Sequence, residues 1–373
     1  MSNLEARLRE ALLRRAEEVS HVERLPRRVE IRAKTRAAIT GSLAILAGVA
    51  LVMTAFVGVR ALQSPNPDRL GPAGAGGPIV FTITRVPSEV HEKHVEAIYT
   101  VNEDGTELHR LTRRGEAGSP TWSPSGDEIA FQRVVTEARR VDQGIYVMRS
   151  TGTGLKELFS LPRRELSIWE VEWSPTGDKI GFILTKVPSG KSTESEWVHR
   201  LYVMNSDGAD MSAITDGGEQ IVDFSWSPDG KKILYTRQTL AAKSRFAYDL
   251  YTMDSDGTNA TPLTQDGRSM DGAWSPDGNR VAFASYTAGR FSERDIYVMN
   301  VDGSSRRLVL ADPYVEEEPA WAPDGSELVF SDFDGRNRCG LMVVRPDGTE
   351  SRSLVDSTGN EGCPGSPAWS PAP

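Results

Sequence analysis

The sequence places acidic residues at one recurring position, three residues before a tryptophan that itself recurs six times. Four of these six positions carry a carboxylate, at Glu170, Asp223, Asp271 and Glu318. Carboxylates held close together repel one another, so such a cluster tends to hold a cation, a basic peptide or a proton. We therefore expect these four residues to bind a ligand or, if a metal is present, calcium. The alternative is a structural network in which they accept hydrogen bonds from backbone amides and water.

No pattern in the sequence predicts a catalytic residue. The Gly-x-Ser-x-Gly nucleophile turn is absent. A metal-dependent hydrolase or lactonase acting at the carboxylates is the alternative function, and it would need a metal and a general base such as histidine. None of the five histidines falls on the segments that carry the carboxylates, so we favour binding over catalysis.

The tryptophans that fix this position belong to an internal repeat. Each is followed by Ser-Pro or, once, by Ala-Pro, and successive tryptophans are 51, 53, 48, 47 and 48 residues apart. A period of this length is typical of one blade of a β-propeller. The six tryptophans are Trp122, Trp173, Trp226, Trp274, Trp321 and Trp369.

Each repeat contains the signals of four antiparallel strands. The Trp-Ser-Pro phrase leads through a glycine turn into a short alternating strand such as Val281-Ala282-Phe283. A second alternating strand follows, and an Asp-Gly pair that suits a hairpin then leads to the last strand. The repeats begin at Ile79 with a second strand and end at Trp369 with a first strand. We therefore predict an all-β, six-bladed propeller over residues 79–373, closed into a ring by the C-terminal strand.

The repeat resembles a known family. Residues 274–303 read Trp-Ser-Pro-Asp-Gly, then Val-Ala-Phe, then Ile-Tyr-Val-Met-Asn and Asp-Gly, which is similar to the TolB-type, WD-like propeller repeat. The resemblance covers roughly residues 79–373. It implies a six-bladed propeller that binds proteins or small ligands. The α/β domain that precedes the propeller in TolB has no counterpart in this sequence.

A membrane span is expected before the propeller. Residues 37–59 contain no charged residue and would extend about 34 Å as a helix, enough to cross a bilayer. Basic residues gather on the N-terminal side, which predicts a cytoplasmic N-terminus and an extracytoplasmic propeller. The family resemblance implies that the source is a bacterium. The alternative is a cleaved signal peptide, whose apolar core is shorter. We assign residues 1–36 to the cytoplasm, 37–60 to the transmembrane helix and 61–78 to a Pro/Gly-rich linker.

The cytoplasmic segment has apolar residues at helical spacing between residues 4 and 22. It is interpreted as an amphipathic helix at the inner leaflet, or as a docking helix, which leaves open a third function as a transmembrane sensor. The formal net charge of the chain is −9. Residues 1–36 contribute +4, so the remaining residues carry −13. An acidic globular part argues against nucleic acid as a partner.

The chain has two cysteines, Cys339 and Cys363, both in the last repeat. Cys339 precedes the third strand of its repeat, and Cys363 lies in the loop before the closing strand. In an antiparallel blade these two positions emerge on the same face, and an extracytoplasmic compartment permits oxidation. We therefore predict a disulfide between them. Taken together, the sequence predicts a membrane-anchored, extracytoplasmic propeller that recognises a protein, a peptide or a small ligand.

Overall fold

The structure is a computed structural model of the 373-residue chain. It describes residues 77–85, 95–113, 116–137, 140–162, 166–186, 197–241, 245–287, 290–311, 314–334, 338–358 and 362–371. These residues belong to one of two compact units, Ser64–Pro373. The cytoplasmic segment, the predicted transmembrane helix and nearly all of the linker lie outside the described residues. No helix suited to crossing a membrane occurs in the part that is described.

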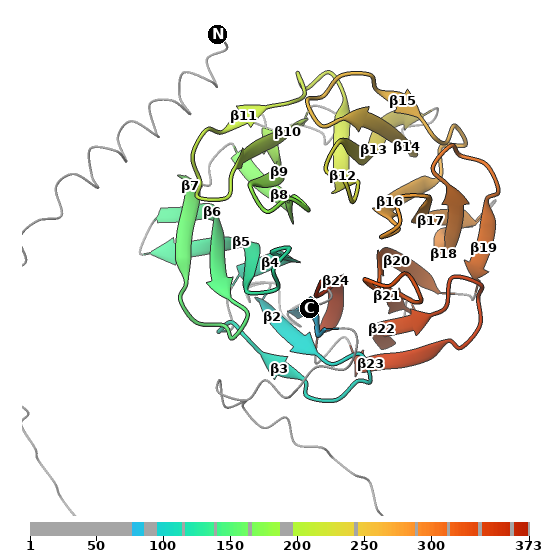
Figure 1. Cartoon of the computed structure of the whole chain (residues 1–373), viewed down its shortest axis with the longest axis horizontal. Coiled ribbons are helices and arrows are strands. Elements are labelled where there is room, and N and C mark those ends of the chain that lie inside the picture. The colour runs from blue at the N-terminus through green and yellow to red at the C-terminus, as the bar shows by residue number, and fades with distance from the viewer. Residues whose placement is uncertain are drawn as a thin grey trace, which may run out of the picture. The chain divides into compact units, whose positions relative to one another are not determined.

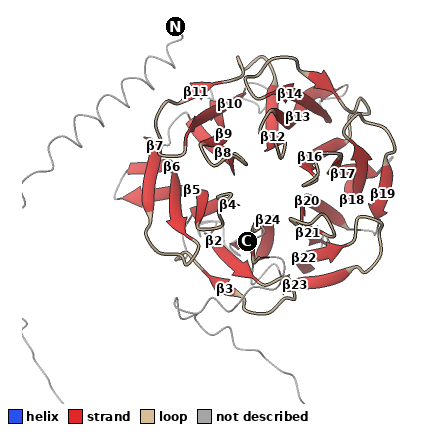
Figure 2. Ribbon diagram, in the orientation of Figure 1, coloured by secondary structure: helices blue, strands red, loops and turns tan. Residues whose placement is uncertain are grey.

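The described residues form strands arranged around a centre (Figures 1 and 2). The innermost strands end at the repeated tryptophans, because alternation there buries the indole between neighbouring sheets. They are β4 (Glu116–Trp122), β8 (Leu166–Trp173), β12 (Gln220–Trp226), β16 (Ser269–Trp274), β20 (Val315–Trp321) and β24 (Cys363–Trp369).

Each inner strand pairs antiparallel with the second strand of its unit. The second strands are β1 (Ile79–Arg85), β5 (Glu128–Glu137), β9 (Lys179–Lys186), β13 (Lys232–Ala241), β17 (Arg280–Thr287) and β21 (Leu328–Phe333). The third strands are β2 (Val95–Val101), β6 (Arg140–Arg149), β10 (Val198–Asn205), β14 (Arg245–Asp254), β18 (Arg290–Asn300) and β22 (Arg338–Val344). The outer strands are β3 (His109–Arg110), β7 (Lys156–Pro162), β11 (Ser212–Ala213), β15 (Thr261–Pro262), β19 (Arg307–Leu310) and β23 (Arg352–Thr358).

The prediction of six separate four-stranded blades is wrong. Hydrogen bonding divides the strands into five sheets, of which four have four strands and one has eight. The eight-stranded sheet contains β16 to β23 and arises because β18 runs parallel to β20 at one residue pair, Arg294 and Val315. Only four sheets therefore stand as separate four-stranded units. The predicted preceding helix has no counterpart among the described residues, all of whose regular elements are strands.

The predicted closure by the last strand is confirmed. β24 pairs with β1 from Ile79–Trp369 to Thr84–Cys363, and the sheet order is β24-β1-β2-β3 (Figure 1). The indole of Trp122 on β4 donates to the carbonyl of Ala368 at 3.2 Å, and the indole of Trp369 donates to the carbonyl of Ala320 at 3.2 Å. β24 is therefore bonded on one flank to β4 and on the other to β20. Closure leaves β1 without an open edge.

The core lies between the sheets. At the closing strand, Ile79, Phe81 and Trp369 pack against Val329 and Leu341 of the neighbouring unit. Phe81 and the phenylalanine at the same place in the next units are fully buried, and each such side chain stabilises the fold by roughly 1.5–3 kcal/mol relative to exposure. The part of each second strand next to this aromatic residue is buried on both faces and is accordingly apolar. The equivalent residues are Phe81, Phe131, Phe182, Tyr235, Phe283 and Phe330.

The predicted Asp-Gly hairpins offer a first test of the fold. Gly257 has φ +88°, and a Cβ there would lie 2.0 Å from the backbone oxygen of Ile214. Because this atom belongs to the backbone, it cannot move aside as a flexible side chain can. We expect Gly257→Ala to destabilise the protein by about 3 kcal/mol, through positive φ and the clash together. Gly154→Ala is the matched control, since its φ is +70° but its Cβ would lie 3.5 Å from a flexible arginine side chain. Equal losses in urea unfolding of the two variants would contradict this account.

Candidate functional site

The repeated acidic position is a β-bulge. In each inner strand the pairing register shifts just before the tryptophan, as it does between Trp169 and Val171. Glu170, Asp271 and Glu318 adopt positive φ angles of 38°, 54° and 56°. Positive φ costs a non-glycine residue roughly 1–2 kcal/mol, and bulges re-aim side chains next to functional sites. The bulges therefore hold these carboxylates in an orientation that a regular strand would not give.

Three of the carboxylates are linked to one another through the backbone. The amide of Asp271 donates to Asp223 Oδ2 at 3.2 Å, and the amide of Glu318 donates to Asp271 Oδ2 at 3.4 Å. The amide of Ser366 donates to Glu318 Oε2 at 2.6 Å. Each carboxylate thus accepts the bulge amide of the next inner strand around the ring. We call Glu170, Asp223, Asp271 and Glu318 the inner acidic ring.

Glu170 differs from the other members of the ring. Within the described residues its carboxylate makes no hydrogen bond and no ion pair. Burial first, and then the charges of Glu318 and Asp223, raise its pKa from 4.5 to about 8. The residue before it, Trp169, keeps 48% of its surface exposed, whereas tryptophans of this fold are otherwise mostly buried. A protonated acid and an open indole thus lie at adjacent positions of β8.

Burial also raises the pKa of the neighbouring acids. The pKa of Asp223 is raised from 3.8 to about 6, although the amide of Asp271 favours its charged form. The pKa of Asp271 is raised well above its usual range by burial and by the charge of Asp223. Glu172, two residues after Glu170, accepts the amide of Trp226 at 3.0 Å, and burial raises its pKa well above the ordinary value. Burial therefore disfavours the charged form of each of these acids.

One cation faces part of the ring. The guanidinium of Arg294, on β18, lies 2.6 Å from Glu317 Oε2 on β20, beside Glu318. It also lies 5.3 Å from the centre of the Tyr286 ring. Its charge lowers the pKa of both Asp271 and Glu317, against the larger effect of burial. Arg294 therefore compensates the β16–β20 side of the ring, whereas no ion pair among the described residues reaches Glu170, Glu172 or Asp223.

An organic cation and a metal ion need different sets of ligands at such a site. Calcium takes six to eight oxygen ligands at one point. The described part of the chain contains no group of three His, Cys, Asp or Glu residues placed to hold a metal ion. An ammonium or guanidinium group needs only one or two carboxylates and gains further from a tryptophan face.

The structure brings the predicted residues together but adds two that the sequence did not single out. Trp169 was missed because it stands beside the repeated position and not at the repeated tryptophan. Arg294 was missed because it comes from a third strand and reaches the inner strand of the following unit. Trp169 is set apart only by its exposure within β8, which the sequence does not show.

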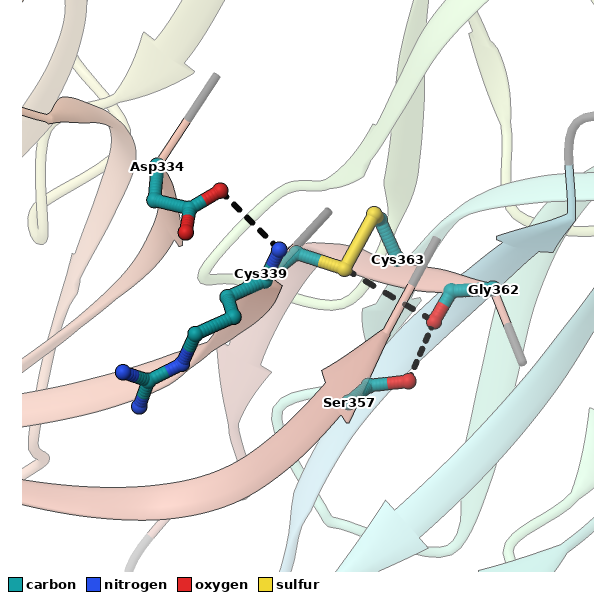
Figure 3. The surroundings of a disulfide bond; sticks show 6 residues. Asp334, Cys339, Ser357, Gly362 and Cys363 are labelled. Carbon is teal, nitrogen blue, oxygen red and sulfur yellow. Dashed lines mark hydrogen bonds between the residues drawn. A yellow bond between two sulfur atoms is a disulfide. The ribbon is translucent and has the colours of Figure 1, made fainter. Parts of the chain in front are cut away.

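The predicted disulfide is confirmed. Cys339 and Cys363 are bonded, with their Cα atoms 5.4 Å apart (Figure 3). Among the described residues there is no free cysteine. The bond joins β22 to β24, so it links two different sheets next to the closing strand.

The geometry defines an all-β propeller with an acidic inner ring, and comparison with known proteins shows which family its sequence resembles. The profile of the TolB β-propeller domain matches residues 234–372. The Tol-Pal system protein TolB of Anaeromyxobacter dehalogenans is 27% identical over 141 residues, which are 38% of this chain and 30% of that protein. Residues 234–372 of the chain therefore resemble the TolB-type β-propeller domain in sequence.

Other relatives extend the comparison. An uncharacterized protein of Agrobacterium fabrum is 31% identical over 209 residues, 53% of this chain and 64% of that protein. The crystal structure of TolB from Acinetobacter baumannii superposes with a TM-score of 0.61 at 22% identity, over 80% of this chain and 68% of that one. Hydrazine synthase of Kuenenia stuttgartiensis gives a TM-score of 0.63 at 14% identity, over 82% and 48%. At these identities the solved structures show a shared fold alone. The chain matches about a third of the length of the TolB sequence that it resembles.

Proposed function

We propose that this protein is a membrane-anchored, extracytoplasmic binding module whose propeller takes a basic side chain of a protein partner at Glu170. Two observations carry the proposal: no hydrogen bond or ion pair of the described residues reaches the Glu170 carboxyl group, and the indole of Trp169, the residue before it on β8, is exposed. A lysine or arginine side chain bound there would meet a carboxylate and an aromatic face together. Cation–π contact with tryptophan adds about 0.5–2 kcal/mol.

The raised pKa of Glu170 makes this binding dependent on protons. With a pKa of about 8 the carboxyl group is mostly protonated at neutral pH, and an arriving cation favours the charged form. Binding should therefore release up to one proton. Isothermal titration in buffers of different ionisation enthalpy measures that release directly.

The proposed location has separate support. The uncharged residues 37–59 with basic residues on their N-terminal side favour an anchored chain with the propeller outside the cytoplasm. The disulfide agrees with that side, because disulfides form in oxidising compartments. The TolB name of the relatives favours a protein partner within the cell envelope. The peptide selection described below tests which sequences the propeller of this chain binds.

The proposal predicts which peptides the propeller selects. The full-length protein in detergent is used to select from a random octapeptide library. We expect enrichment of lysine and arginine, and we expect Glu170→Gln to lower the affinity of the selected peptides about tenfold, or about 1.4 kcal/mol. The matched control is Glu350→Gln, which removes the same charge from a side chain that is 59% exposed and paired with Arg345.

Selection without basic enrichment, or equal binding by the parent and Glu170→Gln, would refute the proposed function. Repeating the selection with millimolar calcium tests whether the inner acidic ring binds calcium in place of a basic peptide. Calcium that competes with the peptides and is itself lost in Glu170→Gln would assign the ring to the metal.

A further inference from the structure

The disulfide anchors the half of the closing strand that precedes its bulge. β24 is divided by its bulge, since its pairing with β1 shifts register between Val80 and Thr82. The half that begins at Cys363 includes Pro364 and Pro367, and neither of these can donate a backbone hydrogen bond. The other half ends in Trp369, whose indole is bonded to Ala320 and whose side chain is only 8% exposed.

The half of β24 that begins at Cys363 leads directly to the inner acidic ring. Three residues after Cys363, the amide of Ser366 donates to Glu318 Oε2 at 2.6 Å and its hydroxyl donates to Oε1 at 3.3 Å. Gly365, between them, accepts a hydrogen bond from the hydroxyl of Thr82 on β1 at 2.9 Å. The position of Ser366 therefore depends on where Cys363 is held.

The disulfide itself is held by a compact set of contacts. Cys339 is 6% exposed, and its Sγ lies 3.9 Å from the carbonyl oxygen of Gly362 (Figure 3). A disulfide sulfur carries no hydrogen, so this is a van der Waals contact. The same carbonyl accepts the hydroxyl of Ser357 at 2.6 Å. Cys363 is more exposed than Cys339, and we therefore take it as the residue that a reductant attacks.

We propose that the Cys339–Cys363 disulfide is a redox control on the inner acidic ring: its reduction frees residues 363–366 of β24, removes the Ser366 donor from Glu318 and weakens ligand binding. The clause on ligand binding rests on the proposed function, whereas the release of the strand does not. The propeller itself stays closed, because the half of β24 that contains Trp369 keeps its packing and its hydrogen bonds.

The reaction requires a dithiol reductant. A thiolate of the dithiol attacks Cys363 Sγ, the Sγ–Sγ bond breaks, and the Cys339 sulfur leaves as a thiolate that takes up a proton. The second thiol of the reductant then displaces Cys363, which is also protonated, and the dithiol becomes a cyclic disulfide. Two electrons pass from the reductant to the cysteine pair. The Cys339 thiol so formed has Gly362 O at hand as a hydrogen-bond acceptor.

Hydrogen exchange followed by mass spectrometry tests the release of the strand. The full-length protein in detergent is measured with and without dithiothreitol, and no ligand is needed. On reduction we expect the amides of Gly365 and Ser366 and the facing amides of β1 to exchange at least about tenfold faster. The amides of β12 and β13, on other repeats, are expected to keep their rates.

The variant Cys339→Ala/Cys363→Ala is the matched control. It should exchange like the reduced parent in both conditions, which shows that the reductant acts through this bond. Unchanged exchange on reduction, or equal acceleration throughout the propeller, would overturn the proposal.

Peptide binding tests the coupling to the ring. Peptides selected by the oxidised parent are expected to bind about threefold to tenfold more weakly to the reduced parent and to the double variant. Local release of the strand with unchanged affinity would overturn the coupling. If the oxidised parent selects no basic peptide, the proposed function fails, and hydrogen exchange still decides whether the disulfide controls the strand.

Discussion

A chain that ends at Gly362 is expected to lose its single cooperative unfolding transition. The deletion removes β24, so all of β1 becomes an unpaired edge. It also removes Trp369 from the core and leaves the indole of Trp122 without the carbonyl of Ala368. Loss of a buried tryptophan costs roughly 3–5 kcal/mol and loss of a disulfide roughly 2–4 kcal/mol, which together approach the whole stability of a typical domain.

Calorimetry and circular dichroism measure this effect. A chain that ends at Pro371 keeps all of β24 and serves as the control, with an expected melting temperature close to that of the parent. The shortened chain should melt broadly or aggregate through the β1 edge. A sharp transition at the parent's temperature for the chain ending at Gly362 would mean that β24 does not close the ring.

The sequence predicted the strands well because each of them carries a local signal. Tryptophan at the end of an inner strand, a buried aromatic residue in the second strand and an Asp-Gly hairpin all act within a few residues. Closure was also predictable, because the order of strands at the two ends of the repeat region leaves only one partner for β24. The number of sheets was not predictable, because it depends on a single parallel contact between Arg294 and Val315, whose strands follow no pattern in common.

The positions of the four acidic residues were predicted from their spacing alone. The difference between Glu170 and the other three, which accept a backbone hydrogen bond, was not predicted. Spacing places Glu170, Asp223, Asp271 and Glu318 at one level, and the structure links three of them through bulge amides. That Glu170 is left without such a bond depends on the backbone of β12, where Asp223 is absent from the residues with positive φ. Conformation at one neighbouring bulge therefore decides which carboxylate is left without a backbone donor.

Arg294→Gln is expected to destabilise the protein most at high pH. Arg294 now lowers the pKa of Asp271 and Glu317, both of which burial raises. Without it the charged forms of these acids are less favourable in the folded state, and their folded pKa values rise further above the unfolded ones. The cost is therefore present when they are charged and disappears when both are protonated in both states. We expect a loss of about 2 kcal/mol near pH 8 and little loss near pH 4, measured by urea unfolding.

Two further variants make the result specific. Arg294→Lys keeps the charge and should recover most of the stability, although it cannot make the same planar contacts.

Glu170→Gln should change the stability in the opposite direction. The folded pKa of Glu170 is raised from 4.5 to about 8, so its stabilising proton is present below the unfolded pKa and is lost as pH rises through 8. Glutamine does not titrate, so this variant should be about 1–2 kcal/mol more stable than the parent near pH 9 and equal to it near pH 4. Parallel pH profiles for the parent, Arg294→Gln and Glu170→Gln would show that the ring carries no electrostatic cost, and that Arg294 compensates none.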